Sequence, residues 1–325
     1  MSSSSRHPSP PPGYRLRATS PDDAAAVARL KAAVDIERHG VSDVTVEYVL
    51  EEWALPRLDL ARDSWVVEDE TGAVVGYGLC WMEAPPDQLA AVQVADPGHR
   101  GRGLGALLLR VCEARAEEMV SAAAGHAAVA TLGVTAHESD VRRLELLERR
   151  GYRRERTFFR LERDLDDSLE PPVWPAAIRT APFRPGVDDA AVHAAHEEGF
   201  ADHYGPAEPD LEEWVRSHFA DGDPDLGLWL VAWDGAEVVG GIEAMETPSG
   251  GFMGELFVRP PWRGRGIGRA LMLQECAELR RRGMQSAFFA VDAANPTGAL
   301  RLHESIGFRS SHGATHLLEK KLRAP

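Results

Sequence analysis

Apolar and polar positions alternate along this chain with two recurring periods. The segments 64–83 (SWVVEDETGAVVGYGLCWME) and 228–246 (LWLVAWDGAEVVGGIEAME) each join two apolar runs through an Asp/Gly turn, which predicts a β-hairpin. Helical spacing with an acidic first turn predicts amphipathic helices at 20–34 and 186–200. Since these patterns follow one another in the same order in both halves, each half is predicted to be a complete α/β unit.

A repeated glycine-rich segment supports this division. His99–Gly105 (HRGRGLG) recurs as Trp262–Gly268 (WRGRGIG), and each copy stands between an apolar run and a predicted amphipathic helix. Further along, 144–165 and 300–322 match each other as a helix ended by glycine and followed by strands. We therefore predict four parts: a disordered Ser/Pro-rich tail at 1–13, an N-terminal domain at 14–165, an acidic, Pro-rich linker at 166–175 and a C-terminal domain at 176–325.

The charge and the cysteines of the chain limit the kinds of partner and cofactor that we expect. The formal net charge of -15, most of it in the second half, argues against a nucleic-acid partner, which needs a basic face. It favours a cationic partner, although solubility explains the same surplus of acid equally well. Cys80, Cys112 and Cys276 are far apart and form no metal-binding spacing, so we expect core residues and no metal. Because the sequence has neither an apolar run long enough for a membrane span nor a signal peptide, we expect a cytoplasmic protein without a membrane partner.

The two glycine-rich segments indicate a site for an anion. Glycines let backbone N–H groups approach a ligand closely, and the N–H groups at the start of a helix favour a negative group such as a pyrophosphate. Flanking arginines add charge-assisted hydrogen bonds. A dinucleotide-binding fingerprint fits poorly, because Arg269 stands where that pattern needs a small residue. A P-loop is excluded because no Gly-Lys-Ser/Thr follows.

These residues resemble the acyl-CoA loop of the GCN5-related N-acetyltransferase (GNAT) family, which has R/Q-x-x-G-x-G/A after V-x-P. In the second half, Val258–Pro260 and Arg263–Gly268 match this pattern in full. In the first half Arg100–Gly105 match it, and Ala95 replaces the valine. Asn295–Phe308 is similar to the family's second motif. The resemblance covers nearly the whole chain after the tail. It implies class α/β (α+β), with two tandem GNAT domains that each have a mixed, mostly antiparallel sheet flanked by helices.

The resemblance also implies acetyl-CoA as co-substrate and names its binding residues. The pantetheine arm is expected along one strand, at Leu256, Phe257 and Val258. The pyrophosphate is expected on the main chain of a loop made of Arg263, Gly264, Arg265, Gly266, Ile267, Gly268 and Arg269, with Asn295 on a neighbouring strand. A second acetyl-CoA loop is expected in the first half, at Arg100, Gly101, Arg102, Gly103, Leu104 and Gly105.

Direct attack of an amine on a thioester needs a base for the ammonium proton and an acid for the leaving thiolate. The family's tyrosine acid falls on His303, which can donate a proton near neutral pH, and in the first half on Leu147, which cannot. Glu255 ranks first as the base, and Glu243 and Glu246 on the preceding strand are alternatives. We therefore expect a catalytic C-terminal domain and an N-terminal domain that binds acetyl-CoA without transferring the acetyl group.

The expected function is transfer of the acetyl group of acetyl-CoA to a primary amine of a small cationic acceptor. Two alternatives stay open: a CoA-binding pseudoenzyme, and a protein or peptide N-terminal acetyltransferase. The tandem architecture is similar to that of the mycothiol synthases, a subfamily whose C-terminal domain acetylates an aminosugar-cysteine conjugate. Neither the identity of the acceptor nor the oligomeric state is predicted.

Overall fold

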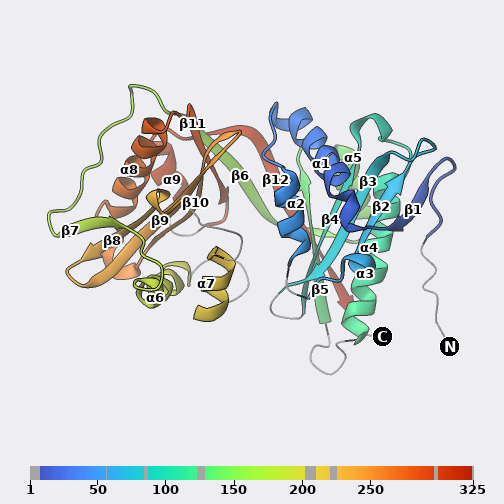
Figure 1. Ribbon diagram of the computed structural model, residues 1–325, viewed down its shortest axis with the longest axis horizontal. Coiled ribbons are helices and arrows are strands. Elements are labelled where there is room, and N and C mark those ends of the chain that lie inside the picture. Colours follow the sequence, from blue (N-terminus) through green and yellow to red (C-terminus); the bar gives the residue numbers. More distant parts are fainter. Residues whose placement is uncertain are drawn as a thin grey trace. The chain divides into compact units, whose positions relative to one another are not determined.

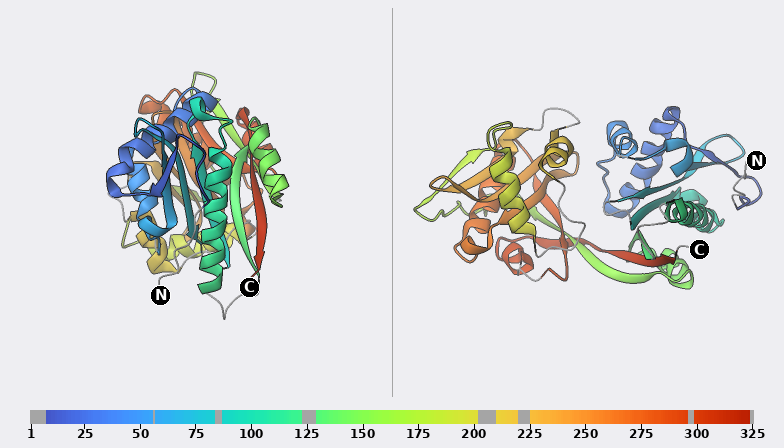
Figure 2. Two further views of the ribbon diagram at one scale, coloured as in Figure 1. Left: turned by 90° about the vertical axis from the view of Figure 1, so that its right-hand side faces the viewer. Right: turned by 90° about the horizontal axis from the view of Figure 1, so that it is seen from below.

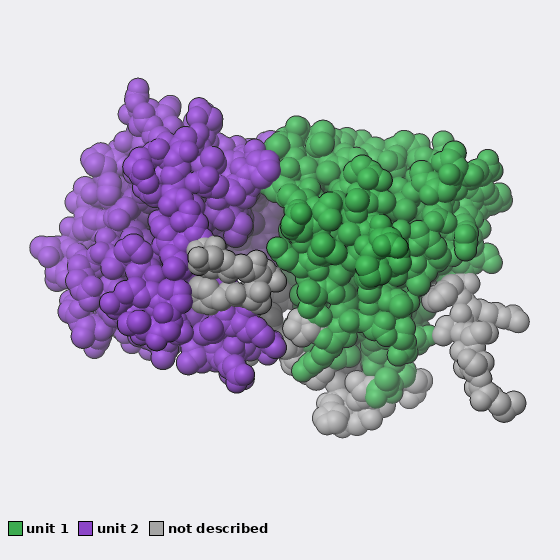
Figure 3. Space-filling model, in the orientation of Figure 1, with its two compact units in different colours: residues 1–157, 314–325 green, residues 158–313 purple. Residues whose placement is uncertain are grey.

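The computed structural model describes residues 8–55, 57–83, 87–122, 129–201, 210–219, 225–295 and 299–323. The chain forms two compact units (Figure 3). Unit 1 comprises residues 1–157 and 314–325, and unit 2 comprises residues 158–313. None of the helices in the described ranges is both long and apolar enough to cross a bilayer. Of the predicted tail, residues 8–13 fall within the described residues and residues 1–7 lie outside them.

The first repeat supplies one set of helices and strands (Figure 1). In chain order they are β1 (Arg15–Ala18), η1 (Pro21–Asp23), α1 (Ala24–His39), α2 (Val46–Trp53), α3 (Leu60–Asp63), β2 (Ser64–Glu68), β3 (Val74–Met82), β4 (Gln88–Ala95), η2 (Pro97–His99), α4 (Leu104–Ala122), β5 (Val129–His137), α5 (Val141–Arg149) and β6 (Arg153–Asp164).

The second repeat supplies the corresponding set. In chain order they are β7 (Ile178–Pro182), α6 (Asp189–Phe200), α7 (Leu211–Phe219), η3 (Leu226–Leu228), β8 (Trp229–Asp234), β9 (Glu237–Thr247), β10 (Gly250–Val258), η4 (Pro260–Trp262), α8 (Ile267–Arg281), β11 (Ser286–Asp292), α9 (Ala299–Ser305) and β12 (Arg309–Arg323).

Each unit is a mixed sheet with helices packed against it. In unit 1 the order β1-β2-β3-β4 is antiparallel throughout, and β4 then pairs with β5 in parallel. In unit 2 the order β7-β8-β9-β10 is likewise antiparallel, and β10 pairs in parallel with β11. The expected α/β class and the mostly antiparallel sheets flanked by helices are therefore confirmed. The predicted hairpins at 64–83 and 228–246 are β2-β3 and β8-β9.

The last strand of each repeat completes the unit formed by the other repeat. β12 pairs antiparallel with β5, from Thr315 opposite His137 to Arg323 opposite Val129. β6 pairs antiparallel with β11. In Figures 1 and 2 the red C-terminal strand accordingly lies beside green elements of the first repeat. The domain boundaries drawn from sequence, 14–165 and 176–325, thus differ from the compact units at these two strands, and residues 166–175 belong to unit 2.

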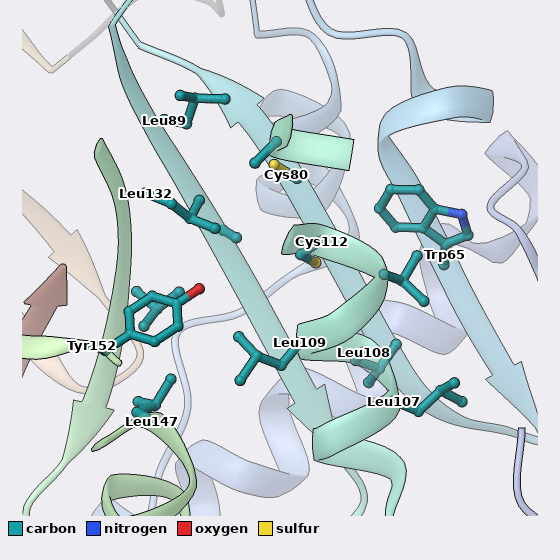
Figure 4. Packing of buried hydrophobic residues seen from close by; sticks show 14 of the residues in the cluster. Trp65, Cys80, Leu89, Leu107, Leu108, Leu109, Cys112, Leu132, Leu147 and Tyr152 are labelled. Carbon is teal, nitrogen blue, oxygen red and sulfur yellow. The ribbon is translucent and has the colours of Figure 1, made fainter. Parts of the chain in front are cut away.

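The cores of the two units show the same exchange. Leu318 and Leu322 of β12 are buried in the core of unit 1, whereas Leu161 of β6 is buried in the core of unit 2. Figure 4 shows the centre of the unit 1 core, where leucines of α4 pack against the sheet and against Leu147 of α5. Burial of these leucines therefore stabilises each exchanged strand against the core of the other repeat.

All three cysteines are buried, which confirms their predicted place in the core. Burial raises the pKa of the Cys112 and Cys276 thiols to about 12, so both are neutral and unreactive at neutral pH.

Candidate active site

The glycine loops end in the left-handed conformation that glycine tolerates best. Gly264 and Gly266 have φ of 73° and 88°, and Gly101 and Gly103 have φ of 77° and 87°. Helices α8 and α4 follow directly, so in both units the unpaired N–H groups of a helix start lie at the loop. A Cβ atom added at Gly264 or Gly266 would meet nothing within 4 Å, so the backbone there is open to a ligand. This opening fits the phosphate groups of CoA.

The arginines of the second loop brace its backbone. Arg263 donates from Nε to the Val258 carbonyl at 3.0 Å and from Nη2 to the Gly199 carbonyl at 2.9 Å. Arg265 donates to the carbonyl of Pro261 at 2.9 Å, and Arg269 pairs with a glutamate. Ile267 is buried, as is its counterpart Leu104. Among these loop residues, the backbone groups are therefore the parts best placed to contact a pyrophosphate.

Strands β10 and β11 separate just where the sequence places the pantetheine arm. Their parallel pairing is limited to Gly251 with Ala287 and Phe252 with Phe288. Leu256–Val258 lie beyond this point, at the end of β10, and Asn295 follows β11 in a turn where its N–H donates to the Asp292 carbonyl. A strand edge released from its neighbour has free hydrogen-bonding groups, which an extended amide-containing chain can use.

β10 carries a bulge on its other edge. Against β9, Met253 pairs with Ala244 and the next pair is Leu256 with Ile242, so Gly254 and Glu255 together stand opposite Glu243. The corresponding pair in unit 1, β3 and β4, runs in unbroken register. A bulge re-aims side chains and leaves a backbone group unpaired. Only the second repeat therefore has this irregularity at the place where the sequence puts the base.

Two histidines surround the Glu255 carboxylate. His196 Nε2, on α6, lies 2.6 Å from Glu255 Oε2, and His218 Nε2, on α7, lies 3.8 Å from the same oxygen. The Nδ1 atom of His218 lies 2.8 Å from the Trp214 carbonyl. Because a carbonyl only accepts, Nδ1 carries a proton, which leaves Nε2 of a neutral His218 as the atom that can take one up.

Burial and neighbouring charges shift the pKa values of Glu255, His218 and Glu243. Burial raises the pKa of the Glu255 carboxyl, but hydrogen bonds to His196 and His218 outweigh that effect and lower the pKa to about 2. Burial lowers the pKa of His218, and its contacts with Glu255 and the Trp214 carbonyl outweigh this, so the net pKa is raised. Burial raises the pKa of Glu243, with Glu255 adding to the effect and His218 opposing it. Glu255 is thus a weak base on its own, whereas His218 can bind a proton near neutral pH.

The sequence analysis singled out Glu255 but missed both histidines. They stand on α6 and α7. The sequence signal that could have indicated a site there is the density of carboxylates and aromatic residues in this stretch. Aromatic neighbours hold them: His196 packs edge-on against Phe257, with ring centroids 5.3 Å apart, and His218 lies 4.4 Å from the Trp214 ring. Close approach of α6 to β10 depends on Gly199, where a Cβ would lie 2.8 Å from the Cβ of Phe257.

His303 differs from the histidines of this cluster in its surroundings. It stands on α9 with 6% of its surface exposed, and its ring packs edge-on against Phe289 at 4.3 Å. Burial lowers its pKa to about 4, so the imidazole is neutral at pH 7. Its counterpart Leu147 is a core residue of unit 1. These surroundings favour a packing role, and proton donation by His303 stays a prediction.

One group of side chains in the described ranges could hold a metal ion. Ligand atoms of His218, Glu243 and Glu255 all lie within 4.8 Å of one another. These are the residues of the cluster already described, so any ion there would compete with a proton for the same atoms. The expectation that the protein uses no metal stays a prediction.

Unit 1 has a cavity of about 600 Å³ at its own loop. It is bounded by α1, the end of β4, the glycine loop and α5. Five arginines and two carboxylates line it: Arg38, Arg100, Arg142, Arg143, Arg149, Asp140 and Glu145. Arg100 donates to Glu37 at 2.7 Å, and Arg102 donates to the Tyr14 hydroxyl at 3.1 Å. Size and positive charge suit a large phosphorylated ligand.

A family model matches both repeats of the chain. Residues 30–152 and 191–308 each match the model of the acetyltransferase (GNAT) family. The chain belongs to the GNAT family. Since the two matched stretches contain the two glycine loops, the resemblance drawn from the loop residues is confirmed for both repeats.

Two relatives match the chain along most of its length. The chain is similar to a mycothiol acetyltransferase of Acidothermus cellulolyticus, 33% identical over 270 residues, which is 78% of this chain and 77% of the relative. A mycothiol acetyltransferase of Saccharopolyspora erythraea is 28% identical over 288 residues, 87% of this chain and 90% of the relative. The expected resemblance to this group of tandem GNAT proteins is confirmed.

Solved structures of GNAT proteins are similar to this chain along nearly its whole length. A GCN5-related N-acetyltransferase from Sphaerobacter thermophilus has a TM-score of 0.81 and 32% identity, covering 97% of this chain and 98% of that one. A tandem GNAT protein from the clavulanic acid biosynthesis pathway has a TM-score of 0.68 at 18% identity, covering 96% and 99%, and shows the fold. The chain is therefore an acetyl-CoA-dependent acetyltransferase with two GNAT domains.

Proposed function

We propose that unit 2 transfers the acetyl group of acetyl-CoA to the primary amine of a small, cationic acceptor. The observation that supports this most is the cluster of His196, His218 and Glu243 around Glu255, at the bulge beside the separated strands. In our proposal this cluster supplies a proton acceptor and negative charge where the amine meets the thioester. Bound acetyl-CoA supplies the activated acetyl group, and the main chain of 256–258 and of the 263–269 loop binds it.

The protein's own residues handle the proton of the acceptor. A protonated amine has no lone pair for attack, so a base must first remove a proton. In our proposal His218 Nε2 accepts it, while the Glu255 carboxylate stabilises the resulting imidazolium and the Trp214 carbonyl keeps Nδ1 protonated. Glu255, the base expected from sequence, then acts together with His218. The family pattern expects His303 to return a proton to the departing thiolate. Because this imidazole is neutral at pH 7 and has no imidazolium proton to give, in our proposal water protonates the thiolate.

The charge of the cluster favours a cationic acceptor. Arg282 pairs with Asp225, Glu246 and Glu278, so its positive charge offsets part of the negative charge of these carboxylates. Glu243 lines a cavity of about 310 Å³ together with Trp229. In the described residues around this cavity, Glu243 and Glu255 are the carboxylates that lie near histidines without an arginine partner. An ammonium group beside them gains a charge-assisted hydrogen bond.

A thiol-release assay with acetyl-CoA tests the proposal. The amine panel contains an aminosugar-cysteine conjugate, because the relatives are named mycothiol acetyltransferases, together with amino sugars, aminoglycosides, polyamines and short peptides. Turnover on a small cationic amine is the expected result. Turnover on peptides alone would favour the N-terminal acetyltransferase alternative.

A matched pair of loop variants assigns the active unit. Glutamates at the second loop (Gly264→Glu with Gly266→Glu) place negative charge where the pyrophosphate binds, so we expect transfer to fall at least about a hundredfold. The same change in the first loop (Gly101→Glu with Gly103→Glu) is the control and should leave transfer nearly unchanged. The opposite pattern would contradict the assignment to unit 2. We further propose that the first loop binds the pyrophosphate of a CoA thioester without transfer.

A further inference from the structure

Arg143 occupies the gap between the separating strands of unit 1. The parallel pairing of β4 with β5 ends at Ala91 and Val134. Beyond this point the Arg143 guanidinium bridges the two strands: Nε donates to the Thr135 carbonyl at 3.0 Å, and Nη1 donates to the Gln93 carbonyl at 3.4 Å. Nη2 donates to Gln93 Oε1 at 2.9 Å. The guanidinium thus stands where, in unit 2, we expect the acyl end of the cofactor.

The Arg143 guanidinium has one carboxylate near enough to favour its charged form, that of Asp140, but makes no ion pair with it. Burial lowers its pKa, but a guanidinium keeps its proton in proteins at ordinary pH. Within the described residues no carboxylate forms an ion pair with Arg143, and its side-chain acceptors are a neutral amide and two carbonyls. Three of its five N–H groups are used by these bonds, which leaves donors for a ligand. A partly buried charge of this kind is stabilised when an anion reaches it.

The second repeat lacks this polar pair. Counting back four positions from Leu147 and from its counterpart His303 places Arg143 opposite Ala299, and the loop alignment places Gln93 opposite Leu256. The unit that we propose to be catalytic therefore has an alanine and a leucine at these positions. Arg143 and Gln93 are a feature of unit 1 alone.

The cavity of about 600 Å³ connects Arg143 with the first glycine loop, since both line it. The carboxylates of Asp140 and Glu145 also line the cavity. A ligand that fills it meets two anion-binding groups, the backbone of the Gly101–Gly105 loop and the Arg143 guanidinium. An acetyl-CoA molecule offers negative charge only to the first. A CoA thioester of a dicarboxylic acid offers negative charge to both.

We propose that unit 1 binds an acyl-CoA whose acyl chain ends in a carboxylate, such as a succinyl or malonyl thioester, and that Arg143 pairs with this carboxylate. The inference rests on the proposal that the first loop binds a CoA thioester. It concerns binding selectivity, and it is independent of transfer by unit 2. An ion pair made in a partly buried site is stronger than one on the surface, so selectivity over acetyl-CoA should be large enough to measure.

Isothermal titration calorimetry on the full chain tests this. The Gly264→Glu, Gly266→Glu variant silences the second loop, so the heat reports unit 1. Succinyl-CoA, malonyl-CoA, acetyl-CoA, free CoA and ADP are titrated separately. We expect succinyl-CoA or malonyl-CoA to bind at least about tenfold more tightly than acetyl-CoA. Arg143→Ala should remove this preference and leave acetyl-CoA affinity within about threefold of the parent.

Arg142→Ala is the matched control, because Arg142 lines the same cavity from the same helix and should weaken all CoA ligands by a similar factor. Arg143→Lys keeps the positive charge and should keep part of the preference. Equal affinity for acetyl-CoA and both dicarboxylic thioesters would overturn the inference, as would a preference that survives Arg143→Ala. Equal binding of ADP would overturn it too, because the ligand would not reach Arg143. Transfer by unit 2, followed in the wild type by thiol release, succeeds or fails separately.

Discussion

The exchange of last strands makes a prediction that can be tested residue by residue. Leu318 lies on β12, at the end of the second repeat, but is 1% exposed in the core of unit 1. Leu161 lies on β6, in the first repeat, but is 2% exposed in the core of unit 2. Leu318→Ala should therefore loosen the unit built from the first repeat, and Leu161→Ala the unit built from the second.

The size of the effect follows from burial. Replacing a fully buried leucine by alanine removes its transfer free energy and leaves a cavity, which together cost about 2–5 kcal/mol. A loss of about 3 kcal/mol in the free energy of local unfolding corresponds to a roughly hundredfold increase in amide exchange rate. Lys321→Ala, an exposed position on the same strand as Leu318, is the control and should change little.

Hydrogen exchange measured by mass spectrometry locates the loss. In Leu318→Ala we expect faster exchange in β5 and α4, with α8 and β10 unchanged, and in Leu161→Ala the reverse. If Leu318→Ala instead accelerated exchange in α8 and β10 while β5 and α4 kept their rates, β12 would stabilise its own repeat. The boundaries at 165 and 176 would then describe the folding units, and the exchanged arrangement would be refuted.

Three further predictions concern titrating groups. Because His218 works as a base only when neutral, kcat/KM should rise with pH through a pKa above its usual 6.5. His218→Gln should lower kcat/KM by about a hundredfold or more and remove this limb, and an unchanged profile would exclude His218 as the base. His303 has a folded pKa of about 4, below its unfolded value, so stability is present above pH 6.5 and is lost as pH falls toward 4, on the order of 3 kcal/mol. In urea unfolding His303→Phe should lack this loss, and a hundredfold drop in its transfer rate would instead support the proton-donor role. Burial raises the pKa of Glu275 to about 8, so its contribution is present below pH 4.5 and is lost as pH rises toward 8. Glu275→Gln should flatten this dependence in thermal unfolding between pH 5 and 8, and equal slopes for both proteins would contradict it.

Contiguous residues by themselves determined the repeat, the glycine loops and the helices that follow them. A left-handed backbone at Gly264 and Gly266 is a property of glycine, and a helix start after it depends only on the next few residues. The hairpins at 64–83 and 228–246 are equally local. The family could therefore be predicted from the sequence, because its motifs consist of such local segments.

The catalytic cluster needed the tertiary structure. Glu255 was found because it stands on the strand next to the loop. His196 and His218 come from two helices 59 and 37 positions earlier in the chain, and only the packing of α6 and α7 on the sheet brings their rings to its carboxylate. For His303 the sequence located the helix position, but the burial that lowers its pKa depends on Phe289 of β11.

The strand exchange is the feature that only the tertiary structure decided. β6 and β12 have the same local pattern, each following a helix ended by glycine, so either strand satisfies the rules of strand formation beside either sheet. Pairing between distant strands is set by which apolar faces meet when the chain collapses, and no local signal specifies that partner. The sequence therefore determined that each half ends in a strand, and the packing of Leu161 and Leu318 in the opposite cores decided where each strand lies.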